Sequence, residues 1–487
     1  MAAIVLICFV CYTGLLFLIT GITSRKANNE TFFTGNRKSP WYIVAYGMIG
    51  ASLSGVTFMS VPGYVESTQF TYFGVVLGYM IGYAVIAFIL LPLYYKLNLV
   101  SIYSYLGKRF GVSSHKTGSA FFVISRLLGS ALRMYLMVYV LYEFVFKGWG
   151  IPFWVPAVIF IVLILLYTFK GGIKTVVWTD TLQTTFMLAA TILCFVFILK
   201  KLDLGAIELF QKATSDGYTK FFEIDWRANN FFVKQILSGA FITIAMTGLD
   251  QDMMQKNLTC KNLKDAQKNM LTFSFTLLIV NLLFLCLGAA LLYYVSASPE
   301  FLALDNPDRL FPSVAFDLGT ITSIFFIIGL IAAGYSSADG TLTALTTTIC
   351  YDFLEFGEKS GLSENKKMRT RKLVHISCAV LYLVVIIAFR PFHNESLIKT
   401  LFDIAGFTYG PLLGLFTFGL ISKRKVNDKY VPIIAILSPI ICYIIRLNSE
   451  AWFWGYKFGF EILILNGLLT CLGLLLISKK SNSYETI

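Results

Sequence analysis

The chain has 487 residues, of which 57% are hydrophobic and 14% are charged, and its mean hydropathy is +0.72. A soluble domain carries about 25% charged residues, so the composition excludes an ordinary water-soluble protein. The formal net charge of +13 does not indicate nucleic-acid binding, because the basic residues lie in short loops between apolar segments. The nine cysteines lie mostly inside apolar segments without metal-binding spacing, which predicts packing residues rather than a metal site or a disulfide framework.

Thirteen apolar segments have the length of membrane-spanning helices. Such a helix needs about 20 apolar residues, and continuous apolar runs favour helices over the alternating strands of a membrane barrel. The first segment lacks a preceding basic region and is longer than the core of a signal peptide, so we expect a retained helix. The predicted spans are 3–22, 41–64, 70–95, 117–146, 151–169, 176–199, 231–255, 270–296, 313–349, 372–391, 397–421, 430–447 and 457–477.

The distribution of Lys and Arg predicts the orientation. With the N-terminus outside, the alternate loops and the C-terminal tail place 26 Lys and Arg on the cytoplasmic side against about 12 on the other. Basic residues near span ends are retained inside, so we expect an outside N-terminus, a cytoplasmic C-terminus and an odd number of spans. The outer segment 200–230 mixes both signs of charge and predicts a solvated connection with room for a short amphipathic helix. The chain, 1–487, is expected to be one transmembrane unit in the cell membrane.

Two of these spans are interrupted by glycines. Residues 47–57 read GMIGASLSGVT, with Pro62 a turn later, and residues 239–252 read GAFITIAMTGLDQD. Paired interruptions in corresponding halves of a chain indicate an inverted repeat whose broken helices form a central binding site. The alternative is ordinary close packing, because small residues are common where membrane helices touch.

Three ionisable residues, Arg133, Asp180 and Asp339, lie within predicted spans, where a charge is costly and indicates function. Arg133 predicts an anchor for a substrate anion, since its guanidinium matches a carboxylate. Its structural alternative is a pair with Glu143 or with backbone carbonyls. Asp180 suits a hard cation, which prefers oxygen ligands. The alternative for Asp180 is a residue at a helix start.

The segment 332–348, AAGYSSADGTLTALTTT, is rich in hydroxyls for a spanning helix. Ser337, Gly340 and Thr341 share one helical face, and Thr343 lies on a neighbouring one. Hydroxyl and carbonyl oxygens together replace the water shell of an alkali cation, so this face predicts a sodium site. The alternative is hydroxyls that bond back to their own helix, which does not explain the carboxylate within the segment.

The sequence gives no support to an enzyme. The three histidines, His115, His375 and His393, never cluster, and no metal-ligand spacing, phosphate loop or nucleophile motif is present. We therefore expect a carrier.

The chain resembles the sodium:solute symporter family over nearly its whole length. The most specific motifs are GASLSGVTFMSVPGY at 50–64, GGIKTVVWTD at 171–180, DQDMMQKNLTCKNLKDAQ at 250–267 and FTYGPLLGLFTFGLISKR at 407–424. The resemblance implies an all-α, LeuT-like fold with a 5+5 inverted repeat. Its parts are an extra helix over 3–22, a first repeat over 41–199, a second repeat over 231–421 and C-terminal helices over 430–477. It also implies a sodium-coupled symporter that imports a small polar solute by alternating access.

The resemblance implies a main sodium site formed by backbone oxygens of Gly50, Leu53 and Ser337 and by the hydroxyl of Thr341. Many family members have two adjacent serines where this chain has Gly340 followed by Thr341, so one side-chain ligand is missing.

Asp339 lies beside this gap and would add compensating charge there. Some similar sialic acid transporters hold a second sodium, which here would use Asp180 and Thr343, although Ala344 replaces another expected serine. Sodium is thus expected as the coupling ion and not as a prosthetic group.

For the solute, the resemblance implies Ser52, Ser54 and Thr57 on the first broken helix and Tyr79 on the next span, where a glutamine would be expected. Arg133 aligns with the arginine that receives the sugar carboxylate in sialic acid transporters. These residues predict a sugar, a sialic acid or a related organic anion as the solute. The other expected partners are sodium and the lipid bilayer, with no obligate protein partner.

Two rival interpretations remain. One is a proton-coupled or uncoupled carrier of the same fold, and the other is a membrane-embedded solute sensor, which the lack of an appended signalling domain disfavours. The sequence leaves open the identity of the solute, the sodium stoichiometry and the oligomeric state.

Overall fold

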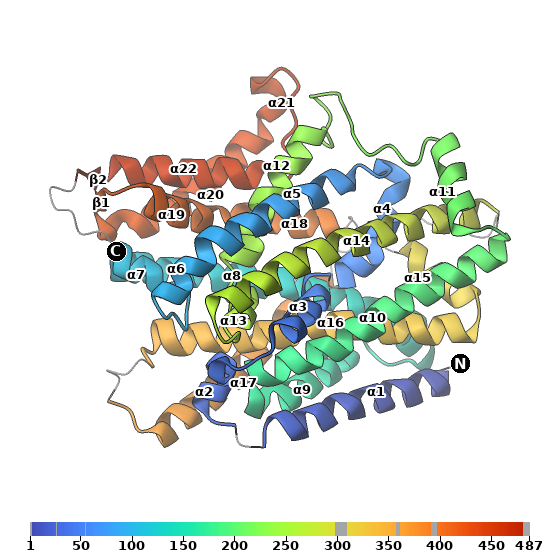
Figure 1. Cartoon of the computed structure of the whole chain (residues 1–487), viewed down its shortest axis with the longest axis horizontal. Coiled ribbons are helices and arrows are strands. Elements are labelled where there is room, and N and C mark those ends of the chain that lie inside the picture. The colour runs from blue at the N-terminus through green and yellow to red at the C-terminus, as the bar shows by residue number, and fades with distance from the viewer. Residues whose placement is uncertain are drawn as a thin grey trace.

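The computed structural model describes residues 2–25, 27–53, 55–297, 309–356, 361–390 and 397–480. Most of these residues form helices that run along the long axis of the molecule, as expected of the predicted all-α fold (Figure 1). The chain begins at one end of this bundle. The short antiparallel pair of β1 (Lys425–Val426) and β2 (Ser478–Lys479) lies at the opposite end.

The helices divide into long helices, shorter helices that follow one another closely, and connecting segments. The long helices are α1 (Ala2–Thr23), α8 (Val112–Leu141), α9 (Trp154–Gly171), α10 (Ile173–Leu202), α14 (Leu263–Ser296), α16 (Thr320–Thr348), α17 (Glu364–Ala388), α20 (Val431–Leu447) and α22 (Ile462–Leu476). The closely spaced helices are α3 (Trp41–Ser52), α4 (Gly55–Thr68), α5 (Tyr72–Val85), α6 (Leu91–Lys96), α12 (Phe232–Thr243), α13 (Gln251–Asn257), α18 (Leu397–Thr408) and α19 (Gly410–Ile421). The connecting helices are α2 (Asn29–Thr34), α7 (Ser104–Arg109), α11 (Ala206–Ser215), α15 (Leu310–Asp317) and α21 (Ser449–Trp452).

Within the described ranges, eight helices are long and apolar enough to cross a membrane, or up to eleven when each bent pair counts as one span. Two further apolar helices are shorter, at Ile7–Thr23 and Ile462–Leu476. The count of thirteen spans stays a prediction. The amphipathic helix expected within 200–230 is present as α11.

One predicted span is wrong at its start. The segment 313–349 is divided, because α15 ends at Asp317 and α16 begins only at Thr320. Gly319 between them has a φ of +117°, a backbone conformation that a right-handed helix does not contain and that glycine adopts at little cost.

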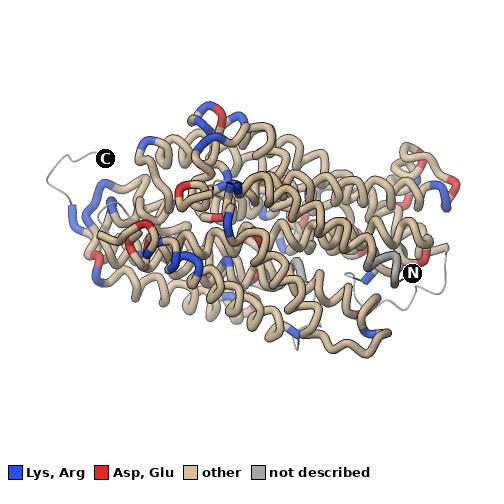
Figure 2. Tube along the Cα trace, turned by 90° about the horizontal axis from the view of Figure 1, so that it is seen from below, with Lys and Arg blue, Asp and Glu red and all other residues tan. Residues whose placement is uncertain are grey.

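Charged residues gather toward the two ends of the bundle (Figure 2). Lys and Arg are concentrated at the end that carries the C-terminus, whereas the opposite end shows a mixture of both signs. The long middle of the bundle shows few charges on its trace, as a lipid-facing surface requires.

Both predicted interruptions are breaks in the structure. The segments Trp41–Ser52 and Thr57–Thr68 meet at 55°, and the segments Phe232–Gly248 and Gln251–Asn257 meet at 71°. At the second break Asp250 has extended backbone, and its side chain caps α13 by accepting a hydrogen bond from the backbone N–H of Met253 at 3.2 Å. Membrane helices tolerate such breaks where the freed backbone is buried in protein or lines a cavity.

A third break, between α18 and α19, was not predicted. The segments Lys399–Thr408 and Gly410–Ile421 meet at 46°. Pro411 lies in the first turn of α19, where its missing N–H cannot bond back to α18. The Gly-Pro pair in the motif at 407–424 was the signal for this break.

α16 is the central helix of the bundle. Every residue from Gly329 to Thr348 is buried, and α16 packs against α10, α8 and α3. The hydroxyl-rich segment therefore faces protein rather than lipid, and its polar groups must find partners inside the bundle.

Close approach of α5 and α12 depends on two glycines. A Cβ added to Gly239 would lie 2.1 Å from the backbone oxygen of Val75, and one added to Gly78 would lie 2.1 Å from that of Ile236. Small residues allow membrane helices to touch at the backbone in this way.

Gly239→Val is therefore expected to force α5 and α12 apart and to lower the free energy of unfolding by about 1–3 kcal/mol or more. Gly21→Val on α1 is the control, since a Cβ there meets nothing within 4 Å. Thermal unfolding of the purified proteins in detergent measures both. Equal midpoints for the two variants would contradict the close packing.

Candidate functional site

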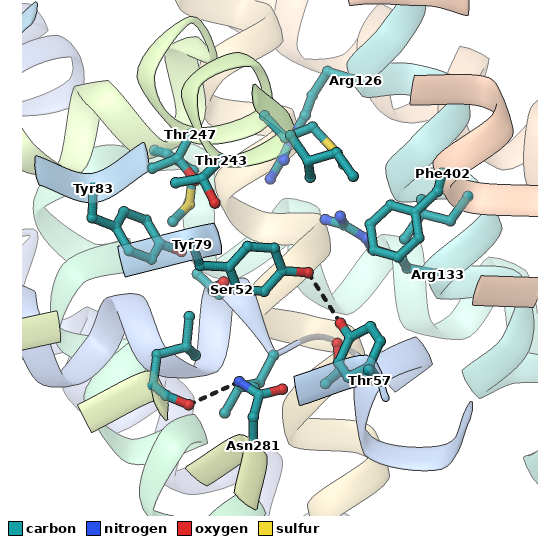
Figure 3. Close-up of a pocket in the computed structure, with 18 residues that line it drawn as sticks. Ser52, Thr57, Tyr79, Tyr83, Arg126, Arg133, Thr243, Thr247, Asn281 and Phe402 are labelled. Atoms are coloured by element: carbon teal, nitrogen blue, oxygen red, sulfur yellow. Dashed lines mark hydrogen bonds between the residues drawn. The ribbon is translucent and has the colours of Figure 1, made fainter. Parts of the chain in front are cut away.

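A cavity lies between the two broken helices, α3–α4 and α12–α13 (Figure 3). Residues of α5, α8, α14 and α18 complete its lining. Its walls carry many hydroxyl and amide groups that were not predicted, namely those of Tyr72, Tyr83, Thr243, Thr247 and Asn281. The lining is suited to a polar solute.

The predicted solute residues come together at this cavity. Ser52, Thr57, Tyr79 and Arg133 all line it, whereas Ser54 lies outside the described residues. Tyr79 shares a hydrogen bond with Tyr72, with the two phenolic oxygens 3.0 Å apart (Figure 3). Each tyrosine hydroxyl keeps hydrogen-bonding capacity for a solute.

Arg133 is a buried cation without a partner. Its side chain is 8% exposed, and across the described ranges its guanidinium forms no ion pair and its Nε atom has no hydrogen-bond partner. The alternative pairing with Glu143 is wrong, because Glu143 pairs with Lys147 at 2.6 Å. An unpaired buried charge is unfavourable, so a site of this kind favours an anion.

Arg126 lies on the same helix, two turns from Arg133, but it is fully paired. Its guanidinium forms an ion pair with Asp252 and lies 3.5 Å from Asp250. Its Nε atom also donates a hydrogen bond to the hydroxyl of Thr341 at 3.0 Å. Asp250 accepts a further hydrogen bond from Tyr409 at 2.5 Å. Arg126 therefore joins α8 to the second broken helix.

Lys256 continues this chain of charges. The sequence places it among the cytoplasmic loop residues, but its side chain is 1% exposed. Its ammonium forms ion pairs with Asp180 at 2.8 Å and with Asp252 at 3.5 Å. Neither contact has the angles of a hydrogen bond. Asp180 also accepts a hydrogen bond from Ser336 at 2.5 Å. The ion pairs thus run from Asp180 through Lys256 and Asp252 to Arg126.

Asp180 does not start a helix. α10 begins at Ile173, so Asp180 lies about two turns inside it and is fully buried. A Cβ added to Gly47 of α3 would lie 3.0 Å from the side chain of Asp180. The carboxylate therefore sits where α3, α10, α13 and α16 meet.

Asp339 is held by neutral donors. It accepts hydrogen bonds from Tyr167 at 2.8 Å, from Gln183 at 3.3 Å and from Thr179 at 3.4 Å. The backbone N–H of Gly340 donates to its other oxygen at 2.6 Å. These donors stabilise the carboxylate inside the bundle.

The close packing of α13 against α16 requires a glycine at position 340, which the sequence did not reveal. A Cβ at this position would lie 2.3 Å from a carboxylate oxygen of Asp252. Glycine therefore allows α13 and its carboxylate to lie against α16. A serine in its place would displace Asp252 from Arg126.

Two of the residues predicted for sodium meet on α16, where the hydroxyl of Thr341 donates to the backbone oxygen of Ser337 at 2.7 Å. The N–H of Gly50 donates to Thr184 of α10 at 3.0 Å, and Leu53 directly follows α3 at the break. The backbone oxygen of Ser337 also accepts a hydrogen bond from Ser130 of α8 at 3.1 Å. Thr341 faces Arg126, a cation.

Thr343, the hydroxyl predicted for a second sodium, is buried without a hydrogen-bond partner among the residues that the structure describes. On α16 the hydroxyl that reaches Asp180 belongs to Ser336, which was not predicted. The signal for it was the pair Ser336–Ser337, two adjacent serines one helical turn before Gly340 and Thr341.

Comparison with known proteins decides the family. The sequence model described as the sodium:solute symporter family matches residues 32–429. The chain belongs to this family. It is accordingly a membrane-spanning, sodium-coupled solute carrier rather than an enzyme.

Its relatives include two bacterial sodium/sialic acid symporters. NanT of Aliivibrio fischeri is 27% identical over 455 residues, which cover 92% of this chain and 88% of NanT. SiaT of Proteus mirabilis is 26% identical over 470 residues, which cover 93% of this chain and 92% of SiaT. The human sodium/iodide cotransporter is 24% identical over 403 residues, covering 80% of this chain and 61% of the cotransporter.

Solved structures support the LeuT-like fold. A Na⁺-coupled sialic acid symporter in its substrate-bound outward-open state superposes with a TM-score of 0.83 at 23% identity, covering 98% of this chain and 99% of that chain. Mhp1, a nucleobase–cation symport-1 family transporter, superposes with a TM-score of 0.57 at 15% identity, covering 93% and 94%. The predicted fold class is confirmed.

The two arginines of α8 are expected to respond oppositely to substitution. Arg126→Met leaves the buried Asp250 without a cation and Asp252 with Lys256 alone, and should lower the free energy of unfolding by about 3–5 kcal/mol. Arg133→Met removes a buried charge that has no partner, and should leave the unfolding midpoint unchanged or raise it. Thermal unfolding in detergent, without added solute, measures both. A similar loss in both variants would show that Arg133 is also a structural cation.

Proposed function

We propose that the chain imports an organic anion of sugar size, of the sialic acid class, together with sodium. The observation that carries this proposal is the unpaired guanidinium of Arg133 in a cavity rich in hydroxyls. A forked guanidinium binds a carboxylate through two parallel hydrogen bonds. The names of the two bacterial relatives support the same solute class.

The remaining lining residues fit the other end of such a molecule. Hydroxyl donors and acceptors from Ser52, Thr57, Thr243 and Thr247 surround the cavity, and a sugar acid offers several hydroxyls to pair with them. Phe402 adds an apolar wall that can pack against a sugar ring (Figure 3). A neutral sugar would satisfy these groups but would leave Arg133 uncompensated.

The main sodium site is proposed at the break after α3, with the backbone carbonyls of Gly50 and Leu53 as ligands. On α16 we assign the hydroxyl ligand to Ser336, which lies about one turn before Gly340. Two observations support this register. Ser336 reaches Asp180 of α10, and Thr341 accepts a hydrogen bond from a guanidinium, which repels a cation.

The orientation follows from the charges. The end of the bundle rich in Lys and Arg is proposed to be cytoplasmic, which leaves the N-terminus outside (Figure 2). The two repeats are proposed at 41–199 and 231–421, since each contains one of the two predicted breaks. Sodium binding between α3 and α16 would then favour the state that receives the solute from outside.

Substituting Arg133 tests the solute class. Arg133→Ala should weaken the apparent affinity for labelled N-acetylneuraminate by about 30-fold or more, because truncating one partner of a buried charge pair costs about 2 kcal/mol or more. Arg133→Lys keeps the charge but loses the forked pair of donors, so its apparent affinity should lie between those of the wild type and Arg133→Ala. Arg227→Ala in the outer connection is the control. Uptake into proteoliposomes under a sodium gradient measures each.

Unchanged affinity in Arg133→Ala for N-acetylneuraminate would remove Arg133 from the site. Uptake of a neutral sugar of similar size with equal affinity in the wild-type protein would contradict the anionic solute. Uptake by each variant is also measured with sodium replaced by choline, which should abolish uptake.

Two hydroxyl substitutions test the sodium site. Ser336→Ala should raise the sodium concentration for half-maximal uptake by about tenfold, the effect of losing a ligand worth about 1.4 kcal/mol. Thr341→Ala should change it by less than about threefold, because its hydroxyl is engaged by Arg126. Sodium activation curves at fixed pH measure both. If Thr341→Ala raised the sodium concentration for half-maximal uptake more than Ser336→Ala does, Thr341 and not Ser336 would be the sodium ligand.

A further inference from the structure

We propose that the ammonium group of Lys256 takes the place of a second sodium ion at Asp180, so that the carrier moves one sodium ion with each solute. Family resemblance leads to the expectation of a second ion at this carboxylate. The geometry instead points to a cation that belongs to the chain itself.

Both oxygens of the Asp180 carboxylate are already engaged. Oδ1 accepts the hydrogen bond from Ser336 at 2.5 Å, and Oδ2 lies 2.8 Å from the ammonium of Lys256. The side chains of Asp180 and Lys256 are each only 1% exposed. A sodium ion at Asp180 would have to displace one of these two groups.

Charge makes that displacement unfavourable. Lys256 also lies 3.5 Å from Asp252, four residues earlier on α13, so two carboxylates hold the ammonium in place. A sodium ion placed beside this ammonium would be repelled by it, and the repulsion is stronger in a buried site than in water.

Of the other ligands expected for a second ion, Thr343 keeps a buried hydroxyl without a hydrogen-bond partner among the described residues, but positions 340 and 344 carry no hydroxyl. Gly340 offers no side-chain ligand, and Asp252 lies in the space where a side chain at 340 would be. Asp339 takes its hydrogen bonds from Tyr167, Thr179 and Gln183. The tethered ammonium therefore replaces a mobile ion at a position where the expected ligands at 340 and 344 are missing.

A tethered cation also changes the energetics of transport. One sodium ion moving with a monovalent anion carries no net charge, so the membrane potential adds nothing to accumulation. This consequence rests on the proposed anionic solute. The ion count at Asp180 does not depend on it.

Equilibrium binding of ²²Na⁺ to the purified protein, without solute, tests the ion count directly. We expect about one bound ion per wild-type chain and about two for Lys256→Met, in which Asp180 is free to take a second ion. Asp180→Asn should keep about one ion, because its carboxylate is not a sodium ligand. Lys234→Met is the control. Lys234 is a buried lysine of α12 whose ammonium lies over the ring of Tyr456, outside the ion pairs around Asp180. This variant should bind as the wild type does.

Two bound ions in the wild type, or a loss of one ion in Asp180→Asn, would overturn the proposal. If Lys256→Met does not fold, the wild-type and Asp180→Asn counts still decide. Uptake of labelled N-acetylneuraminate under an imposed potassium diffusion potential is the second measurement. If one ion is bound and the membrane potential nevertheless drives uptake, the role of Lys256 stands and the proposal of an anionic solute is wrong.

Discussion

The structure depends on a chain of buried ion pairs at the point where the broken helices meet. Asp180 of α10, Lys256 and Asp252 of α13, and Arg126 of α8 alternate in sign along it. In the interior of a membrane protein each of these charges would be costly alone, and removal of one leaves its neighbours uncompensated. The ion pairs therefore hold α13, the second segment of this broken helix, against α8 and α10. They also determine which charges remain available for ligands.

That division explains the chemistry of the cavity. Arg126 and Arg133 both line it and lie on one helix, yet only Arg126 has carboxylate partners within the described part of the chain. The remaining cation, Arg133, is the proposed anchor of the solute. On the other side, α3 lies against Thr184 and Asp180 of α10, which bring hydroxyl and carboxylate oxygens to this region. The proposed anion and sodium sites are thus separate places in one buried region, which is the physical condition for cotransport.

Much of the fold follows from the sequence because its signals are local. Glycines at 47, 50 and 55 and at 239 and 248 marked the two breaks, and the apolar runs marked the spans. The predicted solute residues Ser52, Thr57, Tyr79 and Arg133 come together at the cavity because they lie close to those breaks or on a helix facing them. Their role in binding a solute stays a prediction.

The ion pairs could not be predicted in the same way. Asp180 and Lys256 come from distant parts of the chain, and no local pattern shows that a lysine at a helix end turns inward. The register of α16 was uncertain for a related reason. Hydroxyls recur along the whole segment 336–348, and only packing shows which of them face α10 and which face α8. Family resemblance supplied the class of site, but side-chain contacts were needed to choose Ser336.

The central claim is that sodium and an anionic sugar bind cooperatively at these adjoining places. Calorimetric titration of N-acetylneuraminate into the purified protein, in sodium chloride and in choline chloride, tests it most directly. Cooperative sites predict tighter binding in sodium by about 5–150-fold, and an equal gain in sodium affinity when the sugar acid is present. The same sugar affinity in both salts would contradict coupling between the two sites.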